Sequence, residues 1–310
     1  MTTASSFLSP ASPTCPADLI ERARAKGPAR VAIAAAGAQL PMIAAKEATE
    51  AGVMIPIFVG DAAAIQTEAN TLNWDISDFT LVDAAGEEGA GRAAAEVTGR
   101  GEADALMKGH LHTDVFMKAA LNRDAGLRTG ERLVHIFHIS PPDNGRALMI
   151  SDAAVNVAPD METRRSALKS VARMGQALGI ETPRIAVLSA TESAIPSVPS
   201  SMEAAELTAW AKDNAPEVAV SGPLALDLIL SPEAVAIKGL ENDPVAGKAD
   251  AVIVPDIVSG NALFKSLVYI GGGCAGGVVL GAKAPILLTS RADPPAARLA
   301  SACLAAIMRT

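Results

Sequence analysis

The residues best suited to chemistry stand near the C-terminus, where an apolar run from Pro285 to Leu288 leads into Ser290, Arg291 and Asp293. The run predicts a buried strand, and the residues after it supply a hydroxyl, a fixed cation and a carboxylate. Open α/β sheets bind their ligands at the carboxyl ends of their strands. Because a guanidinium group matches the geometry of a phosphate or carboxylate, this segment predicts a site for an anionic ligand.

Three other apolar segments also end in polar or charged residues, after Met107, after Ile150 and after Val254. Polar or charged residues after four strands are more than we expect from surface charges placed at random. For any single lysine, however, a solvated surface position is the ordinary explanation. The candidate binding residues at these three ends are Lys108, Thr113, Lys118, Asp152, Asn156, Asp256, Asn261 and Lys265.

Two histidines, His110 and His112, follow the first of these strand ends. On an extended segment they would face the same way and could bind a metal ion, but we expect no nearby carboxylate to complete such a site. We therefore favour a helix start, with Thr113 or Asp114 as its cap and its exposed amides turned toward an anion.

The glycine-rich loop from Gly271 to Gly277 contains the pattern GxGxxG. In nucleotide-binding folds a strand precedes this pattern and a helix follows it. Here the sequence predicts a helix before the loop and a strand after it. A dinucleotide site is therefore disfavoured, and close approach of the backbone to another element explains the glycines better.

Short β-type runs alternate with alanine-rich amphipathic stretches, and this alternation predicts a largely parallel sheet with helices on both faces. The expected strands are 30–35, 54–59, 79–82, 103–107, 133–139, 146–150, 184–188 and 251–254, and the region 278–290 with the helix after Pro294 returns to the first sheet. Ser140 to Gly145 are turn residues, so they predict an antiparallel hairpin and a domain boundary near Arg128.

Composition limits the possible partners. The chain has 310 residues, 50% of them hydrophobic, and a net charge of -8, which argues against nucleic acid and anionic membranes as partners. Its three cysteines lack the spacing of a zinc or redox site. No signal peptide and no membrane-spanning run is recognisable, so we expect a cytoplasmic protein.

Five segments together resemble one known family, the phosphate acetyltransferase and phosphate butyryltransferase family. Each motif alone is weak, but their order and spacing match from about Val31 to the C-terminus. The segments are Asp104 to Gly109, Gly126 to Gly130, Ser151 to Asn156, Pro255 to Lys265 and Gly281 to Asp293.

The resemblance implies a two-domain, three-layer α/β/α fold of the isocitrate and isopropylmalate dehydrogenase type, with the active site in a cleft between the domains. Residues 1–127 and 275–310 would form the first domain, and residues 128–274 would form the second, through which a homodimer assembles. The implied reaction is reversible transfer of a short-chain acyl group between CoA and inorganic phosphate, by direct attack in a ternary complex. CoA is then a substrate, and neither a cofactor nor a metal is expected.

The resemblance also implies roles for single residues. Arg291 would hold the phosphate or acyl phosphate oxygens, and Ser290 would donate a hydrogen bond near the thiol or the reacting carbonyl. Ala153 stands where some acetyltransferases of the family carry a cysteine, so this position offers no nucleophile. Oriented reactants and donors aimed at the developing oxyanion would supply the rate.

Two positions depart from the acetyl-specific branch of that family. Ala297 replaces an aspartate that is the expected base for the CoA thiol, and Lys118 replaces a phosphate-binding arginine. Asp293 is one substitute base. Alternatively, a thiol with a pKa of about 8.5 needs only modest help from Arg291 or Lys265. The acyl chain length, acetyl or butyryl, stays open.

Two other classes of function remain as alternatives. One is a dehydrogenase that depends on a metal and NAD and shares the same fold, which would need carboxylates converging on a divalent ion. The other is a homologue that binds acyl-CoA without catalysis, which the alanine at position 297 suggests.

Overall fold

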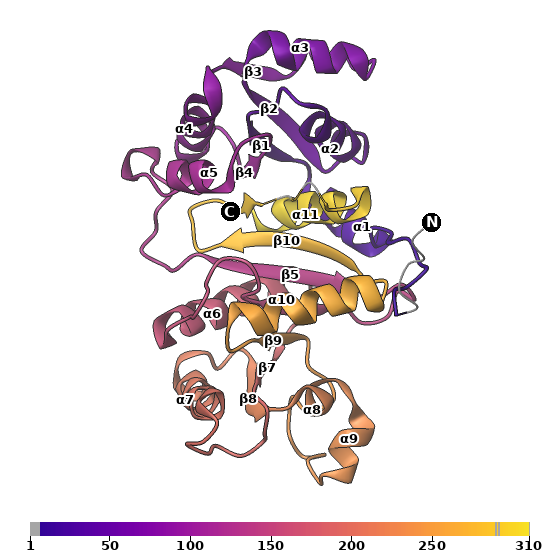
Figure 1. Cartoon of the computed structure of the whole chain (residues 1–310), viewed down its shortest axis with the longest axis vertical. Coiled ribbons are helices and arrows are strands. Elements are labelled where there is room, and N and C mark those ends of the chain that lie inside the picture. The colour runs from indigo at the N-terminus through magenta and orange to yellow at the C-terminus, as the bar shows by residue number, and fades with distance from the viewer. Residues whose placement is uncertain (1–6, 289, 291, 310) are drawn as a thin grey trace. The chain divides into compact units, whose positions relative to one another are not determined.

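The computed structural model describes residues 7–288, 290 and 292–309. The chain divides into two compact units. The first unit consists of residues 13–131 and 276–310, and the second consists of residues 132–275 together with the segment that precedes residue 13. Both units are built from strands and helices (Figure 1).

The first unit contains a sheet with the strand order β3-β2-β1-β4-β11-β10. All neighbouring strands run parallel except β10 and β11, which are antiparallel. The apolar run near the C-terminus supplies the two-residue strand β11, which pairs with the buried middle of β4, as expected. The strands are β1 (Ala29–Ala34), β2 (Met54–Gly60), β3 (Thr80–Asp83), β4 (Ala105–Lys108), β10 (Cys274–Leu280) and β11 (Ile286–Leu287).

Helices flank this sheet in two groups. In Figure 1, α4 and α5 lie on one side of the strands of this unit, whereas α1, α2 and α11 lie on the other. Alanine dominates their buried faces, which lets helix and strand backbones approach closely. The helices are α1 (Ala17–Lys26), α2 (Gln39–Glu50), α3 (Ala62–Thr71), α4 (Gly86–Gly99), α5 (Thr113–Ala120), the 3-10 turn η1 (Arg123–Ala125) and α11 (Pro295–Met308).

The second unit contains the strand order β5-β6-β9-β7-β8. Strands β5 and β6 form the expected antiparallel hairpin, and the other neighbours run parallel. The strands are β5 (Val134–Ser140), β6 (Leu148–Ser151), β7 (Arg184–Leu188), β8 (Ala219–Leu224) and β9 (Ala251–Ile253).

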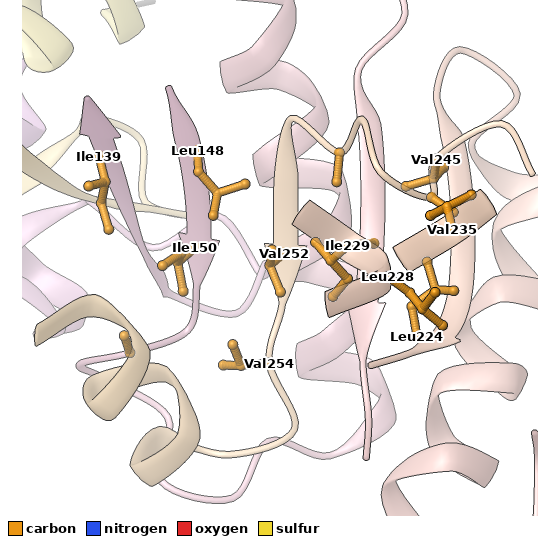
Figure 2. Packing of buried hydrophobic residues seen from close by; sticks show 14 of the residues in the cluster. Ile139, Leu148, Ile150, Leu224, Leu228, Ile229, Val235, Val245, Val252 and Val254 are labelled. Atoms are coloured by element: carbon orange, nitrogen blue, oxygen red, sulfur yellow. The ribbon is translucent and has the colours of Figure 1, made fainter. Parts of the chain in front are cut away.

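The apolar core of the second unit extends across its strands, from the β5–β6 hairpin to Leu224 of β8. Figure 2 shows Ile139 and Leu148 from the hairpin, Val252 from β9, and Leu228 and Ile229 from α8 around one apolar cluster. The helices of this unit are α6 (Met161–Ala177), α7 (Pro199–Asn214), α8 (Leu226–Leu230), α9 (Pro232–Ile237), α10 (Ile257–Lys265) and the π-helical turn η2 (Ser266–Ile270).

The α/β class predicted from the sequence is confirmed, with differences in detail. Strand β8 and the short helices α8 and α9 were not predicted. Helix α10 begins at Ile257 and continues into the π-helical turn η2. The glycine-rich loop does lie between a helix and a strand, in the order that disfavours a dinucleotide site.

Among the residues that the structure describes, no helix combines the length and the apolar character needed to cross a membrane.

Candidate functional site

The strand end after β6 is organised around the buried carboxylate of Asp152. Its Oδ1 accepts hydrogen bonds from the backbone N–H groups of Ala154 and Val155, both at 2.9 Å. Its Oδ2 accepts from the backbone N–H of His135 at 3.0 Å and from the side-chain amide of Asn156 at 2.6 Å. Four donors from the protein thus surround this carboxylate, which holds the loop after β6 in one shape.

The His135 ring lies beside this carboxylate and is itself buried. Burial lowers the pKa of the imidazole from its usual 6.5 to about 4, against the opposing attraction of Asp152. The ring is therefore neutral near pH 7. The side-chain amide of Asn156 also donates to the carbonyl oxygen of Leu133 at 2.8 Å, so Asn156 links the residue before β5 to the residue after β6.

Helix α10 packs directly on this loop. Asp256 caps the helix, because its carboxylate accepts from the backbone N–H of Ser259 at 2.8 Å. The Asn261 amide donates to the carbonyl oxygen of Ala153 at 3.4 Å. A Cβ atom at Gly260 would lie 2.8 Å from the carbonyl oxygen of Asp152, so only glycine allows this close packing.

Lys265 occupies the last turn of α10 and is exposed. The five candidate residues of the second unit therefore belong to one local assembly of β6, β9 and α10. A residue that the sequence reasoning missed supports it: Arg164 on α6 is buried and donates to the carbonyl oxygens of Val254 at 3.3 Å and Pro255 at 2.8 Å. These bonds fix the chain just before Asp256.

The motif after β11 is described only in part, since Arg291 lies outside the described residues. Ser290 is exposed, and its backbone N–H donates to Oδ2 of Asp293 at 2.7 Å. Burial raises the pKa of the Asp293 carboxyl above its usual value, although the hydrogen bond from Ser290 and the charge of Arg298 oppose the shift. Arg298 donates from Nη1 to the carbonyl oxygen of Asp293 at 2.5 Å.

A pocket of about 280 Å³ opens in the first unit where β4 ends. The first turn of α2, the segment from Met107 to His110, and Arg298 of α11 line it. Gly109 is required there, because a Cβ atom would lie 2.3 Å from the carbonyl oxygen of Ala34. The structure thus brings the predicted Lys108 together with Arg298, which the sequence reasoning missed.

Lys118 lies in a different hollow, of about 360 Å³, between α4 and α5. Its neighbours there include the cation Arg92 and the anions Glu88 and Asp114. Lys108 and Lys118 therefore line separate pockets, although both belong to the same stretch of sequence.

The predicted cap of α5 is wrong. His112 occupies the N-cap position, and no side chain caps the helix there. Instead, the carboxylate of Glu87 accepts from the backbone N–H of His112 at 2.9 Å and lies 2.8 Å from its Nδ1. A carboxylate does therefore stand beside this histidine, contrary to expectation. The hydrogen bond from the His112 backbone, followed by its side chain, lowers the pKa of Glu87.

Within the described part of the chain, no three His, Cys, Asp or Glu side chains converge in a way that would hold a metal ion. The groups gathered at the strand ends are cations, amides and hydrogen-bonded carboxylates. The fold and these strand ends define an α/β protein whose first unit is suited to an anionic ligand.

Comparison with known proteins makes this class specific. The family model described as Phosphate acetyl/butaryl transferase matches residues 87–306. A phosphate acetyltransferase of Rhizobium meliloti is 39% identical over 299 residues, which cover 96% of this chain and 94% of that protein. A phosphate butyryltransferase of Clostridium acetobutylicum is 34% identical over 292 residues, covering 94% of this chain and 97% of that protein.

A solved structure agrees with these matches. The crystal structure of a branched-chain phosphotransacylase from Enterococcus faecalis superposes with a TM-score of 0.80 at 32% identity, covering 91% of this chain and all of that one. The chain belongs to the phosphate acetyltransferase and butyryltransferase family, whose members are acyltransferases.

Proposed function

We propose that the protein catalyses reversible transfer of a short-chain acyl group between CoA and inorganic phosphate, by direct attack in a ternary complex. The observation that carries this proposal is the first-unit strand end. There, Lys108 and Arg298 line one pocket, and Arg298 also donates to the carbonyl oxygen of Asp293, in a chain whose residues 87–306 match the family model. No cofactor is required, because CoA enters as a substrate.

In this proposal, Arg291 holds the phosphate oxygens and Ser290 donates near the reacting carbonyl or the thiol. The exposed position of Ser290 is compatible with such a contact. In the second unit, Asp152 and Asn156 hold the loop on which Asn261 rests. The positive charge of the exposed Lys265 then stabilises the thiolate of CoA.

The CoA thiol can lose its proton in two ways. Asp293 is a half-buried carboxylate with a raised pKa, so it accepts a proton more readily than an exposed aspartate. Ala297 is buried and offers no base. The second route is direct ionisation of the thiol, which is a few per cent complete near neutral pH and is favoured by nearby cations.

The finer features of the architecture belong to the same proposal. By resemblance to the family, residues 1–127 and 275–310 form one domain, residues 128–274 form a second that dimerises, and substrates bind in a cleft between them. By the same reasoning the enzyme is a cytoplasmic homodimer that binds neither nucleic acid nor membranes.

A thiol-release assay tests the proposal. Wild-type protein is incubated with phosphate and acetyl-, propionyl- or butyryl-CoA, with arsenate as a second acceptor that draws the reaction forward. We expect thiol release with at least one acyl-CoA and no need for added metal or NAD. Activity only with a metal and NAD would identify the dehydrogenase alternative, and CoA binding without turnover would identify a non-catalytic homologue.

The Arg291→Ala variant tests the anion anchor in the same assay. We expect strongly reduced transfer and a raised KM for phosphate, with nearly unchanged thermal unfolding. The matched control is Arg100→Met, which removes an exposed arginine paired with Glu102 at the surface. Unchanged kinetics in Arg291→Ala would refute the role given to Arg291.

A further inference from the structure

Arg298 is a charged residue in an otherwise apolar helix. Its side chain is only 8% exposed, and within the described part of the chain its buried Nε has no hydrogen-bond partner. A buried N–H group of a guanidinium is costly unless an acceptor completes its hydrogen bonding. Because Arg298 lines the first-unit pocket beside Lys108, its unpaired Nε–H indicates an acceptor in that pocket, and the two cations favour an anionic one.

The first turn of α2 supplies donors to the same pocket. The helix begins after Ala38, and no side chain caps it there. The amides of Gln39 and Leu40 stand in the first turn, where a helix offers them no acceptor, whereas Pro41 has no N–H group to satisfy. The chain enters this turn through Ala35, which has a φ of 54°. Such backbone strain clusters at ligand-binding turns.

One wall of the pocket is apolar, although His110 also lines it. Leu40, Pro41 and Ala44 of α2 face it together with Met107 of β4. A volume of about 280 Å³ lies at the small end of ligand pockets, so it suits a small molecule rather than a whole nucleotide cofactor. A ligand that fits has one anionic end and one short apolar end.

We propose that this pocket binds the acyl phosphate, with its phosphate group against Arg298 and the first turn of α2. The acyl chain then lies against Leu40, Ala44 and Met107, which would set the preferred chain length. The inference rests on the proposed function and deepens it. Arg298 supplies the positive charge that holds the phosphate group in this pocket.

Calorimetric titration with inorganic phosphate tests the anion site without requiring turnover. We expect Arg298→Met, which fills the space without the charge, to weaken phosphate binding about 10- to 100-fold. Arg298→Lys should recover much of the affinity, and the surface control Arg100→Met should bind as the wild type does. If Arg298 only supports the loop at Asp293, Arg298→Met lowers the unfolding temperature but binds phosphate normally, and the inference falls.

The acyl chain is tested with two matched alanine substitutions. Ala44→Val narrows the proposed pocket, and Ala119→Val narrows the hollow that contains Lys118. With CoA as acceptor, we expect Ala44→Val to lower the ratio of kcat/KM for butyryl phosphate over acetyl phosphate about tenfold, because steric exclusion acts on the longer chain. An unchanged ratio, or a fall only in Ala119→Val, contradicts the assignment.

The two experiments separate this inference from the proposed function. A wild type that transfers no acyl group refutes the function, but phosphate binding that is lost in Arg298→Met still supports the anion site. A wild type that transfers acyl groups while Arg298→Met keeps its phosphate affinity leaves the function standing and overturns the inference.

Discussion

The second unit saturates the buried carboxylate of Asp152 after β6 with its own donors, whereas the first unit keeps donors at its strand end that lack an acceptor among the described residues. Asp152 accepts four hydrogen bonds from its own loop and hairpin, and Asp256 caps α10. In the first unit, α2 begins without a side-chain cap. In addition, the buried Nε of Arg298 lacks a partner among the described residues.

This difference indicates a division of labour. A carboxylate that is saturated by four protein donors cannot also anchor a substrate without breaking bonds, so Asp152 shapes its loop. Uncapped amides and an incompletely bonded guanidinium retain their capacity for an anion. We therefore propose that phosphate binds to the first unit and that the exposed Lys265 of the second unit stabilises the CoA thiolate.

The largest expected effect follows from removing the saturated carboxylate. Asp152→Ala leaves buried donors unpaired, and we expect it to lower the free energy of unfolding by about 3 to 5 kcal/mol. Urea denaturation measures this loss. The control Asp143→Ala removes an exposed aspartate that accepts one hydrogen bond from Gly145, so it should cost less than about 1 kcal/mol. Equal losses in both variants would show that Asp152 is not the structural centre of its loop.

The second effect concerns pH and the buried imidazole of His135. Because its pKa is lowered from 6.5 to about 4, the folded protein binds fewer protons than the unfolded chain between these values. Its contribution to stability is complete above pH 6.5 and is lost as the pH falls toward 4.

Unfolding by urea at pH 7, 5.5 and 4 measures this contribution. Between pH 7 and 4, wild type should lose about 3 kcal/mol more stability than His135→Gln, which cannot take up the proton. Parallel losses in the two proteins would mean that the pKa of His135 is the same in the folded and unfolded states.

The smallest effect compares the helix starts of the two units. Asp256→Ala removes a true cap and should destabilise the protein by about 1 kcal/mol, whereas Thr113→Ala should cost less than about 0.5 kcal/mol because Thr113 caps nothing. Thermal unfolding distinguishes the two variants. A larger cost for Thr113→Ala would mean that its hydroxyl supports α5 after all.

Local patterns were sufficient to predict much of the fold. The alternation of strands and helices and the turn residues between β5 and β6 correctly predicted an α/β protein with an antiparallel hairpin. Strand β8 escaped prediction because Gly222 and Pro223 within it resemble a turn. The proline is tolerated because β8 is the last strand in the order of its unit, where a missing N–H costs no ladder hydrogen bond.

Contacts between distant residues could not be predicted in the same way. The cap expected from Thr113 was wrong. Instead, the carboxylate of Glu87, 25 residues before His112, accepts a hydrogen bond from the His112 backbone N–H at the start of α5. Arg298 was missed because its importance depends on burial beside Lys108, which lies far away in the sequence. A lone cation in the apolar helix from Pro295 to Met308 was the one signal available.

Steady-state kinetics with phosphate and acyl-CoA varied independently test the division of labour most directly. Arg298→Met removes a cation from the first unit, and Lys265→Met removes one from the second unit. We predict that Arg298→Met raises the KM for phosphate and spares that for acyl-CoA, and that Lys265→Met impairs the use of acyl-CoA and spares the KM for phosphate. The reverse pattern, or equal effects of both variants on both substrates, would contradict this assignment.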